Sequence, residues 1–302
     1  MRVGVLILPA QSWSESAAHW RAVDAMGFDH AWTHDHIGWR DLLDQTWYAA
    51  LPTLTAAAAV TSRVRLGTLV CTPNYRHPVT LAKEAVALDD ISEGRMILGI
   101  GAGVDGPDAR VLGEPPLDAR TRTARFAEFT ELTDRLLRQD VTDFTGRHYR
   151  AEAARMIPGC RQRPRLPLAV AATGPRVMRT AARHADIWIT NGTSPKPGLR
   201  AAVVDTAIVR EQLERFDEAC AREGRDPAEV DRLVYHGDRT HSALTSADAF
   251  AELAGRYAEL GVTDLVVPFP RTAPPHQADP AVLERIATDV LPALRARHRT
   301  EG

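Results

Sequence analysis

VRLGTLVCTPNYRHPVTLAKEAVALDDISEGRMILGIGAG, residues 64–103, is the stretch that decides the fold. Two apolar runs in it, Val64–Val70 and Met96–Gly101, have the length and composition of buried strands, and an amphipathic pattern over 78–92 separates them. Strand, helix and strand in this order predict a parallel βαβ unit. The loops after Val70 and Ile100 are then expected at the carboxyl ends of the strands, where α/β folds bind their ligands.

The rest of the chain repeats this unit. Further strands are predicted at Val3–Leu8, His30–His34, Leu168–Ala172, Ile187–Thr190, Leu233–His236 and Leu265–Pro268. Helices are predicted from a Ser12/Glu15 capping box to Gly27, and at 43–60, 78–92, 122–138, 175–184, 207–223, 246–260 and 280–297. Loops are predicted at 104–121, 141–166, 191–200 and 269–279. The pattern predicts an α/β protein with a single (β/α)₈ barrel domain spanning residues 1–302.

Composition restricts the class of protein. The chain is 44% hydrophobic and 25% charged, with a formal net charge of −2, so it carries no signature of nucleic-acid binding. Cys71, Cys160 and Cys220 are too widely spaced for a disulfide framework or a metal site, which fits a reducing compartment. No signal peptide precedes the first strand and no apolar run has membrane-spanning length, so we expect a cytoplasmic protein without a membrane partner.

Polar side chains end the second predicted strand, in the sequence WTHDH at 32–36. Alternation places His34 and His36 on one face, a pair that can bind a metal. The fifth strand end, Ala169–Gly174, supplies no further ligand, so we predict no metal site. A general acid or base is better supported, with His36 exchanging a proton near neutral pH and Asp35 giving a hydrogen bond or negative charge beside it. A structural polar rim is the alternative.

The loop after the fourth strand contains the pattern G-x-G-x-x-G from Gly101 to Gly106. It differs from the dinucleotide-binding fingerprint, because no helix follows directly and no acid ends a strand about twenty residues later. The small residues Gly101–Gly103 are expected to let a planar or anionic group approach the backbone, and a tight turn is the structural alternative. Cys71 is expected to be a core residue rather than a thiol nucleophile.

A third candidate is the turn Thr173-Gly174-Pro175, which joins the fifth strand to a helix. Unpaired amides at the helix start, the Thr173 hydroxyl and the Arg176 guanidinium can together hold a phosphate. A plain strand-to-helix turn fits the same residues equally well.

Short motifs along most of the chain carry a family resemblance. In order they are Gly27-Phe28-Asp29 with Asp35-His36, Leu66-Gly67-Thr68 to Pro73, Ile91–Arg95, Leu98–Gly101, Phe144-Thr145-Gly146 with Tyr149, and Ala181–Arg183 with Ala185-Asp186. The chain thereby resembles the luciferase-like monooxygenase superfamily of flavin and deazaflavin enzymes. Its Ala172–Pro175 turn resembles the branch that uses coenzyme F420, closest in pattern to the F420-dependent glucose-6-phosphate dehydrogenase type. This implies a (β/α)₈ barrel with the ring at the strand carboxyl ends and a non-prolyl cis bond, Leu69–Val70.

The resemblance also implies residue roles. His36 is expected to transfer the proton, and the Trp39 indole to wall the substrate pocket. The expected coenzyme contacts are Asp35, Leu69, Val70, Thr72, Ala102, Gly103, Thr173, Gly174, Arg176 and Val177. Two departures argue against a sugar-phosphate substrate, because Val104 replaces the second catalytic acid and Thr193 replaces a phosphate-binding lysine, for which the nearby Lys196 substitutes only partly.

The chemistry of the deazaflavin ring indicates the reaction. A 5-deazaflavin serves chiefly as a hydride carrier, while the protein supplies position and a proton. We therefore expect hydride transfer between coenzyme F420 and a small organic substrate, with reduction of an activated C=C or C=N bond and His36 protonating the product. The alternatives are an FMN-dependent two-component monooxygenase and a non-catalytic flavin-binding protein. The resemblance further implies a homodimer.

Overall fold

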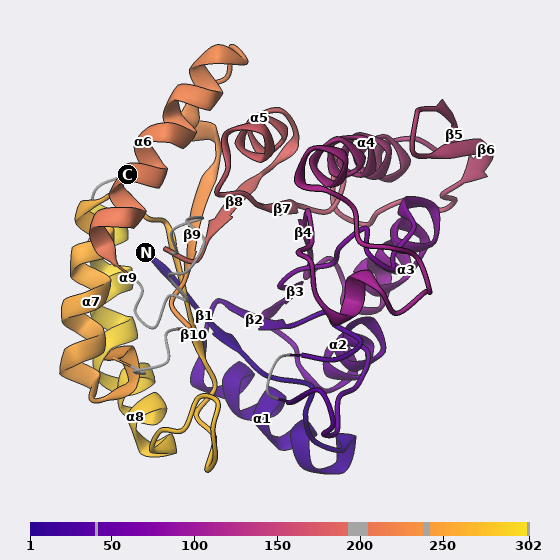
Figure 1. Ribbon diagram of the computed structural model, residues 1–302. Coiled ribbons are helices and arrows are strands. Elements are labelled where there is room, and N and C mark those ends of the chain that lie inside the picture. The colour runs from indigo at the N-terminus through magenta and orange to yellow at the C-terminus, as the bar shows by residue number, and fades with distance from the viewer. Residues whose placement is uncertain (40–41, 193–204, 238–241, 301–302) are drawn as a thin grey trace.

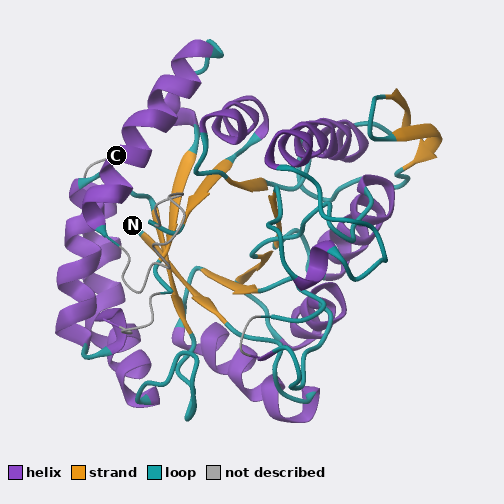
Figure 2. Ribbon diagram, viewed as in Figure 1, coloured by secondary structure: helices purple, strands orange, loops and turns teal. Residues whose placement is uncertain are grey.

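A closed barrel of eight parallel strands forms the centre of the molecule (Figures 1 and 2). The computed structural model describes residues 1–39, 42–192, 205–237 and 242–300. The strands, in barrel order, are β1 (Arg2–Leu6), β10 (Asp264–Pro268), β9 (Asp231–Tyr235), β8 (Ile187–Thr190), β7 (Leu168–Ala171), β4 (Met96–Gly101), β3 (Arg65–Thr68) and β2 (His30–Thr33). The predicted (β/α)₈ barrel is confirmed, and each predicted strand overlaps an observed one.

Helices surround the barrel, as Figure 2 shows in purple. They are α1 (Trp13–Met26), α2 (Ala50–Val60), α3 (Pro78–Ile91), α4 (Ala119–Arg138), α5 (Pro175–His184), α6 (Thr206–Arg222), α7 (Ala247–Glu259), α8 (Pro280–Arg285) and α9 (Leu291–Thr300). A π-helical stretch, Ile286–Val290, joins α8 to α9 within the region predicted as one helix. The helix predicted over 43–60 begins only at Ala50, because Pro52 is tolerated in the first turn of a helix but not further in.

Apolar side chains fill the inside of the barrel. They include Leu6, Trp32, Leu69, Ile97, Ala169, Ile189, Leu233 and Val266, all buried. A Cβ atom on Gly67 would lie 2.3 Å from the ring of Trp32, so the large indole fits because the neighbouring strand carries a glycine there. A second and larger apolar cluster lies between the strands and the helices. Burial on both faces explains why these strands are continuous apolar runs in the sequence.

An antiparallel hairpin projects outside the barrel, where the sequence predicted only a loop over 141–166. It consists of β5 (Val141–Thr145) and β6 (Arg150–Arg155) and lies at the outer edge of Figure 1. The Glu128 carboxylate on α4 accepts hydrogen bonds from the backbone N–H groups of its turn, those of Arg147, His148 and Tyr149. The prediction missed these strands because they are mostly solvent-exposed and lack a buried apolar run.

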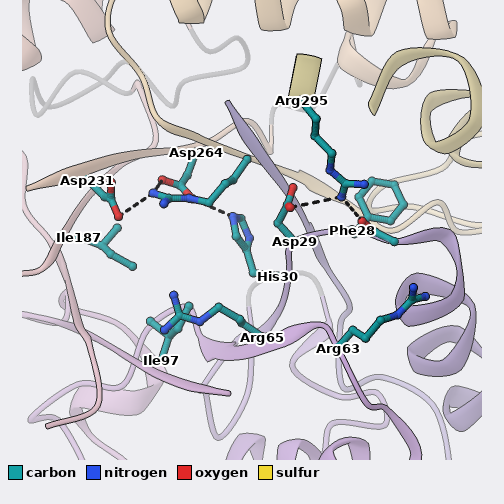
Figure 3. Close-up of a pocket in the computed structure, with 12 residues that line it drawn as sticks. Phe28, Asp29, His30, Arg63, Arg65, Ile97, Ile187, Asp231, Asp264 and Arg295 are labelled. Carbon is teal, nitrogen blue, oxygen red and sulfur yellow. Dashed lines mark hydrogen bonds and ion pairs between the residues drawn. The ribbon is translucent and has the colours of Figure 1, made fainter. Parts of the chain in front are cut away.

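A cavity of about 410 Å³ opens at the amino-terminal end of the barrel (Figure 3). Asp264, at the start of β10, accepts two hydrogen bonds from Arg2, of 2.7 and 2.6 Å, and lies 3.0 Å from Nε2 of His30. Burial alone would raise the pKa of Asp264, but Arg2 and His30 hold it well below its usual range. Ion pairs and hydrogen bonds around the buried Asp264 carboxylate therefore stabilise this end of the barrel. Ligands bind (β/α)₈ barrels at the opposite end.

Candidate active site

The strand carboxyl ends bring His34 and His36 together, as the sequence predicted. Their ring centroids are 5.8 Å apart. His34 is buried, and its Nδ1 lies 2.6 Å from the carbonyl oxygen of Leu69 at the end of β3. His36 lies further out, with 25% of its side chain exposed. The second histidine therefore combines access to solvent with a place beside His34, which contacts the β3 terminus.

Asp108 is the carboxylate that holds His36. Nδ1 of His36 lies 2.5 Å from Oδ2 of Asp108, and the backbone N–H of Ile37 donates to Oδ1 at 3.0 Å. Burial alone would raise the pKa of Asp108, but the hydrogen bonds from His36 and from the backbone at Ile37 and Gly38 bring it below its usual value. Asp108 is consequently ionised at neutral pH and accepts the hydrogen bond, so the proton of this contact resides on the imidazole.

Asp35 does not pair with His36, which corrects the role predicted for it. Its carboxylate is almost fully buried and accepts two hydrogen bonds from the Arg76 guanidinium, of 3.0 and 2.8 Å. This fork-to-fork pair engages both carboxylate oxygens of Asp35, and its negative charge beside His36 stays a prediction. Asp35 thus anchors the loop after β3 to the end of β2.

The end of β3 has the backbone geometry that the family resemblance implied. The Leu69–Val70 peptide bond is cis. A Cβ atom on Gly99 would lie 1.8 Å from the carbonyl oxygen of Thr68, and one on Gly101 would lie 2.6 Å from Cγ2 of Val70. The glycines of β4 therefore make room for the end of β3.

The space beside the Gly103 α-carbon is likewise occupied by a neighbouring side chain. Its φ is +72°, and an added Cβ would lie 2.8 Å from the Asn74 amide. Side chains of the adjacent strand and loop thus fill the Cβ side of Gly101 and Gly103, and the approach of a planar or anionic group to this backbone stays a prediction. Ala102, between them, is half-buried against the core.

Thr72 offers an unused polar atom close to this point. Its hydroxyl oxygen is buried and has no hydrogen-bond partner among the described residues. A buried hydroxyl without a partner is costly unless a bound molecule or water satisfies it. Thr72 follows the cis bond by two residues, so this hydroxyl marks a polar binding position at the carboxyl end of β3.

An aromatic wall borders the two histidines. Trp39 is 8% exposed, stacks on Trp47 with ring centroids 5.7 Å apart and lies 5.1 Å from the His34 ring. Trp47 also donates from Nε1 to the carbonyl oxygen of His36, at 2.9 Å. Trp39 therefore lies next to the histidines, where the substrate wall was predicted, and Trp47 supports it from behind.

The Thr173-Gly174-Pro175 turn is open at the start of α5. No side chain caps this helix, and no atom lies within 4 Å of the position that a Cβ on Gly174 would take. The first amides of a helix, here those of Arg176 and Val177, have no partner within it and carry partial positive charge. The turn has the geometry of an anion site.

Other candidates contribute no chemistry in the described part of the chain. Cys71 is fully buried, and burial raises the pKa of its thiol, so it is a core residue. No three His, Cys, Asp or Glu side chains of the described residues come together as metal ligands. None of the described helices combines the length and apolar character needed to cross a membrane. Thr193 and Lys196 lie outside the described residues.

Three residues of this site were missed from the sequence. Asp108 lies in the short 3₁₀ turn Pro107–Ala109 of a long loop, and Arg76 and Trp47 lie in loops as well. The partners of Asp108 and Arg76 come from the end of β2, while Trp47 lies in the same loop as its partners His36 and Trp39. No periodicity indicates these pairings. The one available signal was an acid next to a proline in a loop expected at the catalytic end.

Comparison with known proteins identifies the family. The model of the luciferase-like monooxygenase family matches residues 1–287. The chain belongs to this family. Among curated luciferase-like relatives, an F420-dependent glucose-6-phosphate dehydrogenase of Beutenbergia cavernae is 34% identical, over 90% of this chain and 91% of that enzyme. A 4-hydroxyprotoasukamycin monooxygenase of Streptomyces nodosus subsp. asukaensis is 35% identical, over 69% of this chain but only 53% of that protein.

Solved structures show the same fold. The coenzyme F420-dependent tetrahydromethanopterin reductase of Methanopyrus kandleri superposes with a TM-score of 0.76 at 19% identity, covering 97% of this chain and 99% of that chain. At this identity the likeness establishes the luciferase-like barrel and says nothing about the substrate.

Proposed function

We propose that this luciferase-like protein is a coenzyme F420-dependent oxidoreductase that reduces an activated C=C or C=N bond of a small organic substrate. The full-length similarity to an F420-dependent dehydrogenase supports the coenzyme. The observation that carries the reaction is the His36–Asp108 pair, an imidazole fixed by an ionised carboxylate beside the end of β3. We expect the enzyme to act as a homodimer, a point that light scattering in solution tests.

The residues at the strand ends fit this coenzyme. The unpartnered Thr72 hydroxyl offers a buried hydrogen bond, and Leu69 and Val70 at the end of β3 would support the ring. The open turn at Gly174 and the amides that begin α5 suit the coenzyme's phosphate. When bound, the deazaflavin supplies a hydride.

His36 supplies the proton. Its Nδ1 is engaged by Asp108, so Nε2 is the nitrogen left to exchange a proton with the substrate. The carboxylate stabilises the positive charge that the imidazole carries before it gives up its proton. By the family resemblance, Val104 stands where a second catalytic acid would be, and reduction of a double bond needs only the one proton that we assign to His36.

Apolar side chains around the mouth indicate the class of substrate. Ile37 is 54% exposed and Val104 is 69% exposed, and they lie on the two loops that Asp108 joins. With Trp39 they give this entrance an apolar character that does not suit a sugar phosphate. We propose a substrate with an apolar body next to its reducible bond.

Fluorescence titration with coenzyme F420 and with FMN tests the coenzyme. We expect F420 to bind at least tenfold more tightly, a difference of about 1.4 kcal/mol. Comparable affinities, or FMN that copurifies, contradict the proposal. A panel of α,β-unsaturated carbonyl compounds and imines, each supplied with reduced F420, then tests the reaction, and turnover of any of them also excludes a non-catalytic flavin-binding protein.

The second candidate is an FMN-dependent two-component monooxygenase, favoured by the 35% identity to the Streptomyces monooxygenase. It predicts oxygen consumption and a hydroxylated product when a separate reductase supplies reduced FMN. Absence of oxygen uptake, together with F420 turnover, excludes it.

A further inference from the structure

A groove between helices α4 and α5 is lined by arginines and shares only Arg176 with the site described above. Its volume is about 340 Å³. Its charged lining residues are Arg120 from α4 and Arg176, Arg179 and Arg183 from α5, and no lining residue in the described chain is acidic. The α5 positions are three and four residues apart, so their guanidinium groups form one row along the helix.

These positive charges are only partly neutralised. Glu223 accepts hydrogen bonds from Nε of Arg179 at 3.2 Å and of Arg183 at 2.5 Å. The Arg120 charge helps to lower the pKa of the exposed Asp118 carboxyl, and Glu223 makes no contact with Arg120 or Arg176. Like charges in one groove repel each other, so an anion that fills it is favoured.

The groove begins beside the Thr173-Gly174-Pro175 turn, to which we assign the phosphate of the coenzyme. Helices of a (β/α)₈ barrel run back from the carboxyl ends of the strands, so the first turns of α4 and α5 lie at the catalytic end. Arg120 and Arg176 are each the second residue of their helices, and the two helices lie side by side in Figure 1. From Gly174 to Arg183 the row extends about 14 Å at 1.5 Å per residue.

We propose that this groove binds the oligoglutamate tail of coenzyme F420, an inference that rests on the proposed function. In this coenzyme a lactyl group and a chain of glutamates follow the phosphate, so the tail is an acidic peptide that leaves from the Gly174 turn. Each glutamate brings a carboxylate, which a guanidinium group binds in a two-pronged manner. The groove supplies such groups at successive turns of α5 and from the facing α4.

The test compares two forms of the coenzyme, one with several glutamates and F420-0, which has none. Dissociation constants are measured by deazaflavin fluorescence, without any substrate, at low and high salt. We expect the wild type to bind the long form about tenfold more tightly at low salt, and this preference to shrink as salt screens the charges. The double variant Arg120→Gln/Arg179→Gln should lose most of the preference and keep the wild-type affinity for F420-0.

Arg256→Gln is the matched control, because Arg256 is an exposed arginine on α7, across the barrel from the groove (Figure 1). It should behave as the wild type with both forms. Equal wild-type affinities for the two forms, or a double variant that keeps the full preference, would overturn the tail site while leaving the F420 proposal intact. If neither form binds, the proposed function itself fails and the tail site with it.

Discussion

Nδ1 of His36 lies 2.5 Å from Oδ2 of Asp108, although the two residues are 72 positions apart in the chain. The contact joins the loop after β2 to the loop after β4, and the backbone N–H of Ile37 strengthens it through the second carboxylate oxygen. The imidazole is therefore held from one side, with its other nitrogen directed away from Asp108. A loop carboxylate thus provides the support for His36 that the sequence predicted from Asp35.

Asp108→Asn should slow reduction of the substrate about ten- to a hundredfold. Asparagine keeps the size and one hydrogen bond but removes the negative charge, and hydrogen bonds to charged groups contribute about 1.5–3 kcal/mol. The affinity for F420 should change less than twofold, because Asp108 contacts the proton donor rather than the coenzyme. Single-turnover oxidation of reduced F420 measures the rate.

Asp105→Asn is a control on the same loop, since Asp105 pairs with the exposed Arg110 at 2.6 Å. It should leave the rate within about twofold, as expected for surface ion pairs. If both variants lose the same rate, the loop as a whole matters and Asp108 has no specific role.

Gly174→Val should weaken F420 binding at least tenfold without destabilising the protein. The φ angle of Gly174 is −99°, which any residue adopts, and no atom lies near the added Cβ, so the folded chain accepts the side chain. The valine would occupy the approach to the helix amides that we assign to the phosphate. Fluorescence titration and the melting temperature are measured together; an unchanged dissociation constant places the phosphate elsewhere.

The sequence predicted the barrel well because each strand is buried on both faces and each helix has one apolar side, so local patterns reflect the global fold. It also singled out His36 and the turn at Gly174, each three residues after the end of a strand; their roles stay predictions. The pairing of Asp108 with His36 could not be predicted from the sequence, because it depends on the path of a long loop. The glycines of β4 indicated close approach to the backbone, but their sequence did not show that Val70 is the neighbour on the Cβ side of Gly101.

Asp264→Ala should lower the free energy of unfolding by about 1–3 kcal/mol, because the buried His30 ring and the Thr263 hydroxyl lose a hydrogen-bond partner while Arg2 keeps its pair with Asp231. Asp264 is 2% exposed and binds both Arg2 and His30. Asp231→Ala is the control, since its carboxylate pairs with the same arginine but is 40% exposed, and it should cost less than about 1 kcal/mol. Urea denaturation measures both; equal losses contradict a special role for the buried pair.

The same ion pair makes stability depend on pH. The folded pKa of Asp264 is depressed, so its contribution is fully present above the unfolded value of about 3.9 and is lost as the pH falls toward the folded pKa. The stability difference between the wild type and Asp264→Asn should therefore be constant from pH 5 to 7 and shrink below about pH 4. A difference that persists undiminished at pH 2.5 contradicts this assignment.

His36→Ala should slow turnover by roughly 10²–10⁴-fold, the usual effect of losing a general acid or base. F420 affinity should change much less, because the Thr72 hydroxyl, the β3 terminus and the α5 amides are proposed to hold the coenzyme. His36→Asn separates positioning from proton transfer: asparagine can still donate to Asp108, but it cannot exchange a proton near neutrality. Both variants should therefore be slow when chemistry limits the rate. Wild-type turnover by His36→Asn would show that His36 only positions the substrate and that the proton comes from another group.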